Sequence, residues 1–317
     1  MSSALLPILA EVVRSGFVES THTGSAVAID SDGKVVLALG DVDRPCFPRS
    51  SNKPLQTVGM VRAGLDLPDD LLALASASHS GEPMHVEGVR RLLDSAGLDP
   101  SALQCPPAMP MNPAALRASY VAGEGPDLLR MNCSGKHAAM LATCVAAGWP
   151  TQTYLDPAHP LQREIRATVE ELAGERVAHT GVDGCGAPLF AITLTGLVRA
   201  YRSVVSSDPG TGARRVADAF RAYPELTSGT EREEARLMRG VRGLMNKGGA
   251  EGVDAAGLQG GAALAVKIAD GSQRARTPVT VALLKALGVS APILDELATA
   301  PVLGGGRSVG EVRVLGL

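Results

Sequence analysis

A serine and a lysine three residues apart, in Arg49-Ser50-Ser51-Asn52-Lys53-Pro54, are side chains whose types and spacing suit catalysis. A lysine one helical turn after a serine can remove the hydroxyl proton and leave a nucleophilic oxygen. The amine must be neutral to do this, and burial or a second cation lowers the pKa of a lysine from its usual value of about 10.4. The spacing also arises by chance, and Pro54 disfavours helical angles at Lys53, so an ordinary helix start is the alternative interpretation.

A second serine and a second lysine are candidates for the same chemistry. Ser78 lies in the polar run Ala77-Ser78-His79-Ser80, directly after apolar residues, where loops leaving a scaffold often carry function. The alternative is a polar turn with a helix cap. Lys267 interrupts an apolar strand pattern and shares its face with small alanines, which would leave room for a ligand. The alternative there is an edge-strand lysine that discourages aggregation.

Two compact, glycine-flanked loops carry thiols, in Asn132-Cys133-Ser134-Gly135-Lys136-His137 and in Asp183-Gly184-Cys185. Thiolates from separate loops can meet at a zinc ion. The third ligand stays open: His137 is the conventional nitrogen donor, whereas Lys136 can bind only after losing its proton. Buried or redox-active thiols are the alternative to a metal site. Asp183 is a candidate anchor for a substrate ammonium group.

Strands at both ends of the chain and helices between them are expected to position these side chains. Residues 24–30 and 34–39 alternate around the turn Ser31-Asp32-Gly33, which predicts a hairpin. Residues 262–270 and 310–317 are further strand candidates, and 248–261 is glycine-rich and loop-like. Apolar periodicity predicts helices over residues 55–64, 86–96, 137–147, 161–173, 189–205, 212–222 and 231–245. The pattern favours an α+β fold with an antiparallel sheet built from both chain ends.

Composition narrows the class of protein. Of the 317 residues, 45% are hydrophobic but only 3% are aromatic, so the core must be filled by Leu, Val and Ala. A net charge of -3 gives no field that would gather nucleic acid or an anionic membrane. The start of the sequence lacks a basic leader, and no stretch has the roughly 20 apolar residues of a membrane helix. Five cysteines at irregular spacing favour reduced thiols, and we expect a cytoplasmic enzyme.

Taken together and in order, these motifs resemble the Rhizobium-type L-asparaginase family, a class 3 group of the asparaginase II family. The resemblance runs over most of the chain and is strongest at Asn132-Cys133-Ser134-Gly135-Lys136-His137 paired with Asp183-Gly184-Cys185. It implies a fold similar to serine β-lactamases and penicillin-binding proteins, formed as one catalytic unit over residues 1–317. In that unit a helical region of about residues 50–250 lies between terminal strands. The spacing between the first two motifs and the stretch 248–261 depart from the family pattern, which puts substrate preference in doubt.

The resemblance also implies roles for individual residues. Hydrolysis of L-asparagine to L-aspartate and ammonia would use two serine-lysine pairs, Ser50 with Lys53 and Ser78 with Lys267. Zinc would bind at the positions of Cys133, Lys136 and Cys185, without necessarily being essential. Arg49, Asp183 and His137 are candidates for substrate binding, and a homodimer is implied. The rival hypotheses are a β-lactamase or other penicillin-recognising acyl hydrolase, and a non-catalytic amino-acid-binding or zinc-binding protein.

Overall fold

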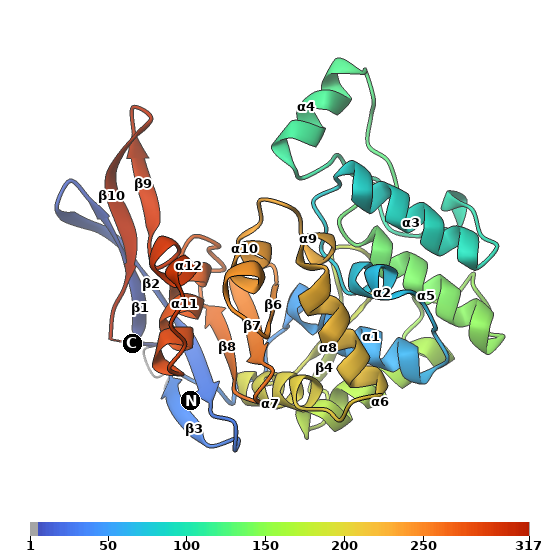
Figure 1. Ribbon diagram of the computed structural model, residues 1–317, viewed down its shortest axis with the longest axis horizontal. Coiled ribbons are helices and arrows are strands. Elements are labelled where there is room, and N and C mark those ends of the chain that lie inside the picture. Colours follow the sequence, from blue (N-terminus) through green and yellow to red (C-terminus); the bar gives the residue numbers. More distant parts are fainter. Residues whose placement is uncertain (1–5, 317) are drawn as a thin grey trace.

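One large antiparallel sheet is built from both ends of the chain in the computed structural model, which describes residues 6–316 (Figure 1). Its strands are β1 (Ile8–Arg14), β2 (Phe17–Ile29), β3 (Val35–Leu39), β6 (Leu244–Gly248), β7 (Val253–Leu258), β8 (Ala263–Ile268), β9 (Ala300–Gly304) and β10 (Arg307–Val314). They follow the order β6-β7-β8-β2-β1-β10-β9, with β3 paired to β2 beside this path. The predicted α+β class, with its sheet assembled from both chain ends, is confirmed.

The hairpin of β2 and β3 forms where the turn residues predicted it. The Asp30 carboxylate accepts hydrogen bonds from the backbone amides of Asp32 and Lys34, both at 2.9 Å. Gly33 has a φ of +84°, a conformation that favours glycine. This local chemistry favours the turn, and Arg202 of α7 adds hydrogen bonds to the Ser31 carbonyl at 2.9 and 3.3 Å.

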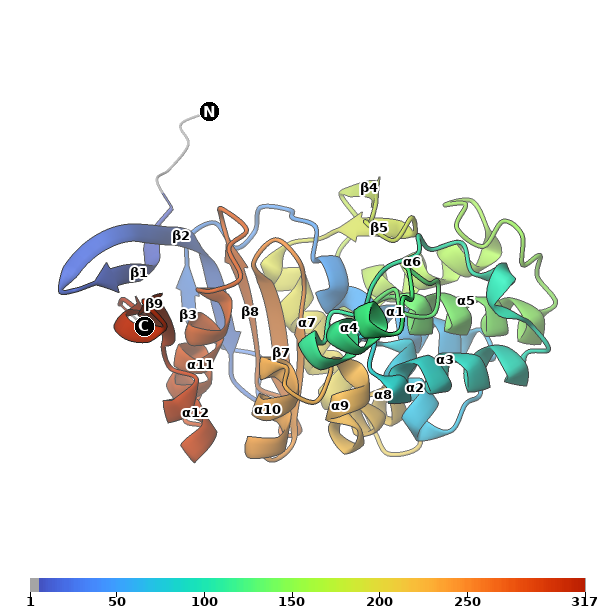
Figure 2. The ribbon, with the colours of Figure 1, turned by 90° about the horizontal axis from the view of Figure 1, so that it is seen from above.

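Helices occupy most of the chain between β3 and β6. They are α1 (Lys53–Arg62), α2 (Asp69–Ala75), α3 (Pro83–Ser95), α4 (Pro113–Val121), α5 (Ser134–Ala147), α6 (Pro160–Ala173), α7 (Leu194–Val205), α8 (Gly212–Ala222), α9 (Pro224–Thr227) and α10 (Glu233–Gly240), with 3₁₀ turns η1 (Arg49–Asn52) and η2 (Pro100–Ala102). A separate hairpin joins β4 (His179–Val182) to β5 (Pro188–Ala191), and α11 (Arg276–Ala286) and α12 (Pro292–Glu296) precede β9. The sheet lies at one end of the molecule and helices α1 to α6 at the other (Figure 2).

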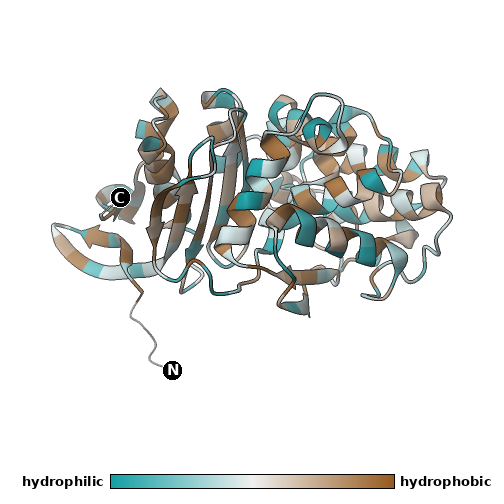
Figure 3. Ribbon diagram, turned by 90° about the horizontal axis from the view of Figure 1, so that it is seen from below, coloured by the Kyte–Doolittle hydropathy of each residue, from teal (hydrophilic) through white to brown (hydrophobic). Residues whose placement is uncertain are grey.

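Helices α7 and α11 cover opposite faces of the sheet. On β7, Thr280 of α11 donates a hydrogen bond to Asp254 at 2.8 Å, whereas Val205 of α7 lies against Gly257. Residues an odd number apart on a strand face opposite sides, so the two helices bury the two faces. The sheet strands are mainly hydrophobic in Figure 3, and the buried core is dominated by Leu, Val and Ala, as the composition predicted.

The predicted elements near the glycine-rich stretch are wrong in type. Residues 244 and 245, expected at the end of a helix, belong to β6, and the expected loop 248–261 contains β7. Residues 189–191, expected at the start of a helix, belong to β5. The elements that were not predicted are β1, β4, β9, α2, α4, α9, α11 and α12. Small residues at the tightly packed β6–β7 pair removed the alternation that marks a half-exposed strand. Within residues 6–316, no helix has the length and apolarity needed to cross a bilayer.

Candidate active site

Ser50 lies in η1, where the chain turns sharply into α1. Arg49, directly before it, has a φ of +52°, a strained conformation for a residue with a side chain. Pro54 does not separate Ser50 from Lys53, because Lys53 adopts helical angles and its backbone amide bonds to the Ser50 carbonyl. Ser50 is half-buried, while Ser51 is fully buried and its hydroxyl donates to Pro48 O at 2.6 Å. Of the two adjacent serines, Ser50 is the one that a substrate can reach.

The Lys53 amine is buried and joins two of the predicted clusters. Its Nζ donates to Ala77 O at 2.5 Å, to Ser78 Oγ at 2.9 Å and to Cys133 Sγ at 3.0 Å. Lysine has three N–H donors, so these contacts satisfy an ammonium group. The structure therefore brings Lys53, Ser78 and Cys133 together and pairs Ser78 with Lys53, while Ser50 lies one turn before Lys53 along the chain.

Lys267 lies elsewhere. On β8 its Nζ donates to the backbone carbonyls of Glu251 at 2.5 Å and Ile268 at 2.9 Å. It lines a cavity of about 310 Å³ together with Ser25 and Cys46. The structure shows no contact between Lys267 and Ser78 among the described residues.

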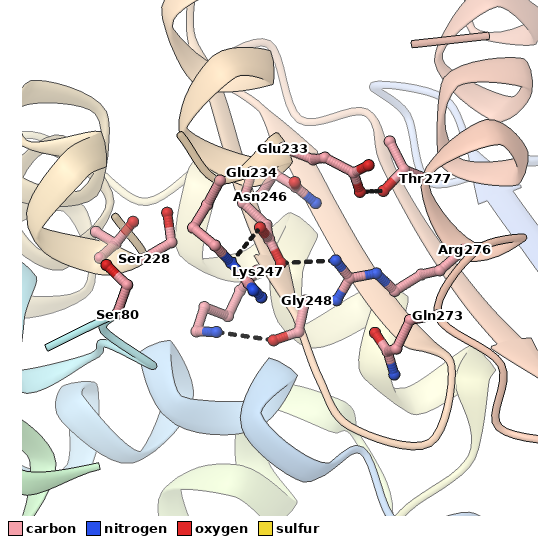
Figure 4. A network of polar contacts seen from close by, with 12 residues as sticks. Ser80, Ser228, Glu233, Glu234, Asn246, Lys247, Gly248, Gln273, Arg276 and Thr277 are labelled. Atoms are coloured by element: carbon pink, nitrogen blue, oxygen red, sulfur yellow. Dashed lines mark hydrogen bonds and ion pairs between the residues drawn. The ribbon is translucent and has the colours of Figure 1, made fainter. Parts of the chain in front are cut away.

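Lys247 on β6 was missed by the sequence analysis and lies beside Lys53. It is 1% exposed, and its Nζ donates to the Gly248 carbonyl at 2.7 Å (Figure 4). Burial, followed by the positive charge of Lys53, lowers the pKa of Lys247 to about 7. Gly249, which directly follows β6, packs against Ser50: a Cβ on Gly249 would lie 3.3 Å from the Ser50 amide nitrogen. Lys247 is therefore an amine that is partly neutral at pH 7, on a strand end that touches the nucleophile candidate.

The two thiols predicted to meet do so at the start of α5. Lys136 Nζ donates to Cys185 Sγ at 3.1 Å, and Cys133 hydrogen-bonds Cys185. That bond to Cys133, and then the Lys136 charge, hold the pKa of Cys185 far below its usual value. The same bond and burial raise the pKa of Cys133. Burial alone would lower the pKa of Lys136, but the two sulfurs outweigh it and raise that pKa. The cluster is an ammonium-thiolate pair with a second thiol attached.

These donors fit a zinc ion. Among residues 6–316 no three His, Cys, Asp or Glu side chains are arranged to hold a metal, so Lys136 would have to serve as the third ligand. The lowered pKa of Cys185 favours its thiolate form, and both Cys133 and Lys136 would release a proton to a bound cation. His137 Nδ1 lies 2.7 Å from the Tyr154 hydroxyl, and burial lowers the pKa of His137 despite its interaction with the Cys185 sulfur.

Arg49 and Asp183, predicted to bind substrate, form an ion pair. Arg49 Nε lies 2.9 Å from Asp183 Oδ1, and Arg49 Nη1 lies 3.8 Å from a carboxylate oxygen of the exposed Glu251. The pair links the turn before Ser50 to the loop that carries Cys185. His137 is fully buried, whereas the side chains of Arg49 and Asp183 are partly exposed.

An antiparallel sheet with a helical middle defines the class of fold as α+β. Within that class, the chain belongs to the L-asparaginase II family, whose family model matches residues 10–314. The predicted resemblance is thereby confirmed at the level of the asparaginase II family. No curated protein matches the sequence.

Solved structures that match include a β-lactamase from Mycobacterium bovis, at 17% identity, over 84% of this chain and 95% of that one, with a TM-score of 0.46. A Bacillus glutaminase matches at 12% identity, over 87% and 91% of the two chains, with a TM-score of 0.37. Mglu in its tris and glutamate form matches at 14% identity over 90% of this chain, with a TM-score of 0.43. The chain spans 62% of the length of Mglu.

Proposed function

We propose that this protein is an amidohydrolase that converts L-asparagine to L-aspartate and ammonia, with Ser50 as the nucleophile. The observation that carries the proposal is the half-buried Ser50, which lies one turn before the buried Lys53 and packs against Gly249, two residues after the buried Lys247 with its pKa of about 7. Membership of the L-asparaginase II family supports amide hydrolysis and makes L-asparagine the first substrate to test.

Lys247 accepts the proton of Ser50 in this mechanism, and the Ser50 oxygen attacks the side-chain amide carbon. A general base works best when its pKa lies near the working pH, which Lys247 satisfies. Ser78 donates its hydroxyl proton to the departing nitrogen and regains one from Lys53, whose Nζ lies 2.9 Å from Ser78 Oγ. The products of this half-reaction are ammonia and an aspartyl ester on Ser50.

Water completes the cycle. Its proton passes through Ser78 to Lys53, which is neutral after the first step, and Lys247 returns its proton to the Ser50 oxygen as the ester breaks. Both lysines then regain their starting states, so protons balance over the two steps. Like-charge repulsion between Lys53 and Lys247 lowers the pKa of Lys247, which explains why the site contains two lysines.

Arg49 and Asp183 are proposed to hold the amino-acid end of the substrate. Their ion pair presents a guanidinium for the α-carboxylate and a carboxylate for the α-ammonium group. Such recognition leaves the side-chain amide free to reach Ser50.

Ammonia release tests the proposed function. Purified enzyme is expected to release ammonia from L-asparagine faster than from L-glutamine, whose amide is one methylene further from the groups that Arg49 and Asp183 bind. Each substrate is assayed with and without a chelator, and hydrolysis of a chromogenic β-lactam is measured alongside. Release of no ammonia from either amide would contradict the proposal, and β-lactam hydrolysis in its place would favour the rival acyl hydrolase.

We propose that zinc binds at Cys133, Lys136 and Cys185. There it would hold the two loops together and set the net charge of this cluster next to Lys53. We expect purified enzyme to hold about one zinc ion per chain and the C185S variant to hold none, because a serine hydroxyl is a poor zinc ligand. Elemental analysis after dialysis at neutral pH measures both. The matched control is C144S, which changes a buried thiol of α5 outside the cluster and should keep the metal. Fully active wild-type enzyme without zinc would leave Cys133 and Cys185 as structural thiols.

We also propose a cytoplasmic location, from the composition and the cysteine pattern, and a homodimer, from the family resemblance. Light scattering coupled to size-exclusion chromatography measures the mass of the protein in solution. A mass of one chain at micromolar concentration would contradict the dimer.

A further inference from the structure

We propose that the buried ion pair between Glu234 of α10 and Arg276 of α11 is a positioning device for catalysis, which fixes the end of β6, and with it Lys247, against Ser50. The inference deepens the proposed function and rests on it. Neither residue touches Ser50, so both act through the strand.

The ion pair is deeply buried and directed at the strand end. Glu234 Oε1 lies 2.7 Å from Arg276 Nη2, and the side chains are 4% and 5% exposed (Figure 4). Arg276 Nη1 also donates to the Gly249 carbonyl at 3.5 Å, and Gln273 Nε2 donates to the same oxygen at 3.4 Å. Two side chains that precede or begin α11 therefore hold the carbonyl of one residue of the strand end.

Contacts continue from the ion pair to the nucleophile candidate. Gly248 has no room for a side chain, because a Cβ there would overlap both Arg276 and Glu234. On the next residue, Gly249, a Cβ would lie 3.2 Å from the Ser51 amide nitrogen and 3.3 Å from that of Ser50. The two glycines are thus enclosed between the ion pair and η1, and a shift of the pair would move the backbone beside Ser50.

Glu234 also influences the pKa of Lys247 through its negative charge. Burial alone would raise the pKa of Glu234, but Arg276 and then Arg232 lower it to about 2, so Glu234 is charged at neutral pH. Its negative charge raises the pKa of Lys247, whereas the nearby cations lower it. The charged or titratable groups on the surrounding elements are Lys53 of α1, Arg232 and Glu234 at α10, Asp254 of β7, Arg276 of α11 and, near the start of β6, Arg221 of α8.

Holding the two helices together does not by itself require this ion pair. Glu233, one residue earlier, already joins α10 to α11 by accepting a hydrogen bond from Thr277. A buried ion pair is often no more stabilising than apolar residues of the same volume, because both charges lose their hydration. Glu233 therefore provides a matched control: it joins the same helices but is not among the charges that shift the pKa of Lys247.

Lysine NMR tests the electrostatic part without requiring any enzyme activity. The chain has six lysines, so ¹³Cε labelling gives few resonances, and the Lys247 signal is assigned by its loss in K247M. In E234Q the pKa of Lys247 should fall by about one unit, because its nearby negative charge is gone. The acidic limb of the kcat/KM profile for L-asparagine should move to lower pH by the same amount. E233Q should leave both values unchanged.

The double variant E234Q/R276Q separates charge from geometry and removes the buried charges as a pair if E234Q alone fails to fold. Its Lys247 pKa should stay within about half a unit of wild type, because charges of opposite sign are lost together. Its kcat should still fall at least about tenfold, with KM changed less, because the Gly249 carbonyl loses its hydrogen bond from Arg276 and the strand end is held less firmly. An unchanged Lys247 pKa in folded E234Q, or an unchanged kcat in the double variant, would overturn the inference. Failure of wild-type enzyme to release ammonia sinks the proposed function instead, and the NMR result still stands on its own.

Discussion

Replacing Ser50 by alanine is expected to lower kcat for L-asparagine at least about a thousandfold while leaving the fold intact, because the acyl intermediate of the proposed mechanism forms on the Ser50 oxygen. Ser50 is half-buried and lies outside the apolar core, so loss of its oxygen removes little packing. Ammonia release measures kcat, and thermal unfolding should give a melting temperature close to that of wild type. A folded S50A enzyme with full activity would rule out Ser50 as the nucleophile.

Two neighbouring serines serve as controls for S50A. Ser51 is fully buried with its hydroxyl bonded to Pro48, so S51A should lose some stability but little catalysis. Ser78 is held by Lys53, and S78A should lose about a hundredfold in kcat because it removes a proton donor and leaves the nucleophile in place. If S78A were the inactive variant and S50A the slower one, the roles of the two serines would be exchanged.

A local clash provides an independent test of the packing around the site. In G248A the new methyl group would overlap the Arg276–Glu234 pair, so we expect a loss of about 1–3 kcal/mol in the free energy of unfolding. Urea denaturation measures it. G260A is the matched control, since no heavy atom lies within 4 Å of a Cβ built there. Equal free energies of unfolding for G248A and G260A would mean that the Arg276–Glu234 pair moves aside at little cost.

Motifs whose geometry is local could be predicted from the sequence. Ser50 and Lys53 are one turn apart because η1 runs directly into α1, and the hairpin at Gly33 forms around the local hydrogen bonds to the Asp30 carboxylate. Cys133 and Lys136 begin the same helix. Their meeting with Cys185 followed from the resemblance and not from spacing, because it depends on how two distant loops pack.

The second lysine could not be assigned from sequence because its environment is made by distant elements. Lys247 follows Leu244-Met245-Asn246, which continues a helical pattern, and precedes two glycines that suggest a loop. Its burial depends on β7 and α10, which pack on β6. Lys267 was chosen instead because it interrupts an apolar strand pattern. Its strand was correctly predicted as β8, but alternation alone does not tell which cavity a side chain faces.

The K247M variant is expected to lose about a hundredfold to ten-thousandfold in kcat/KM, because methionine fills the volume of the side chain but accepts no proton. In wild-type enzyme, catalysis needs Lys247 neutral, so kcat/KM should rise with pH through the pKa of about 7 and level off above it. The value of kcat/KM rises with pH because below pH 7 the protonated amine of Lys247 cannot accept the proton of Ser50. Initial rates of ammonia release between pH 5 and 9 give the profile, and K247M should lack this limb.

K267M distinguishes the two candidate lysines under the same conditions. Lys267 bonds only to backbone carbonyls among the described residues and lines a separate cavity, so its loss should change kcat/KM less than about threefold and leave the limb near pH 7 in place. A large loss in K267M together with normal activity in K247M would return the second catalytic position to Lys267. Both lysines lie on strands of one sheet, but Lys247 is 1% exposed whereas Lys267 is only partly buried. Burial, and then the positive charge of Lys53, lowers the pKa of Lys247, so that this amine is ready to accept a proton near neutral pH.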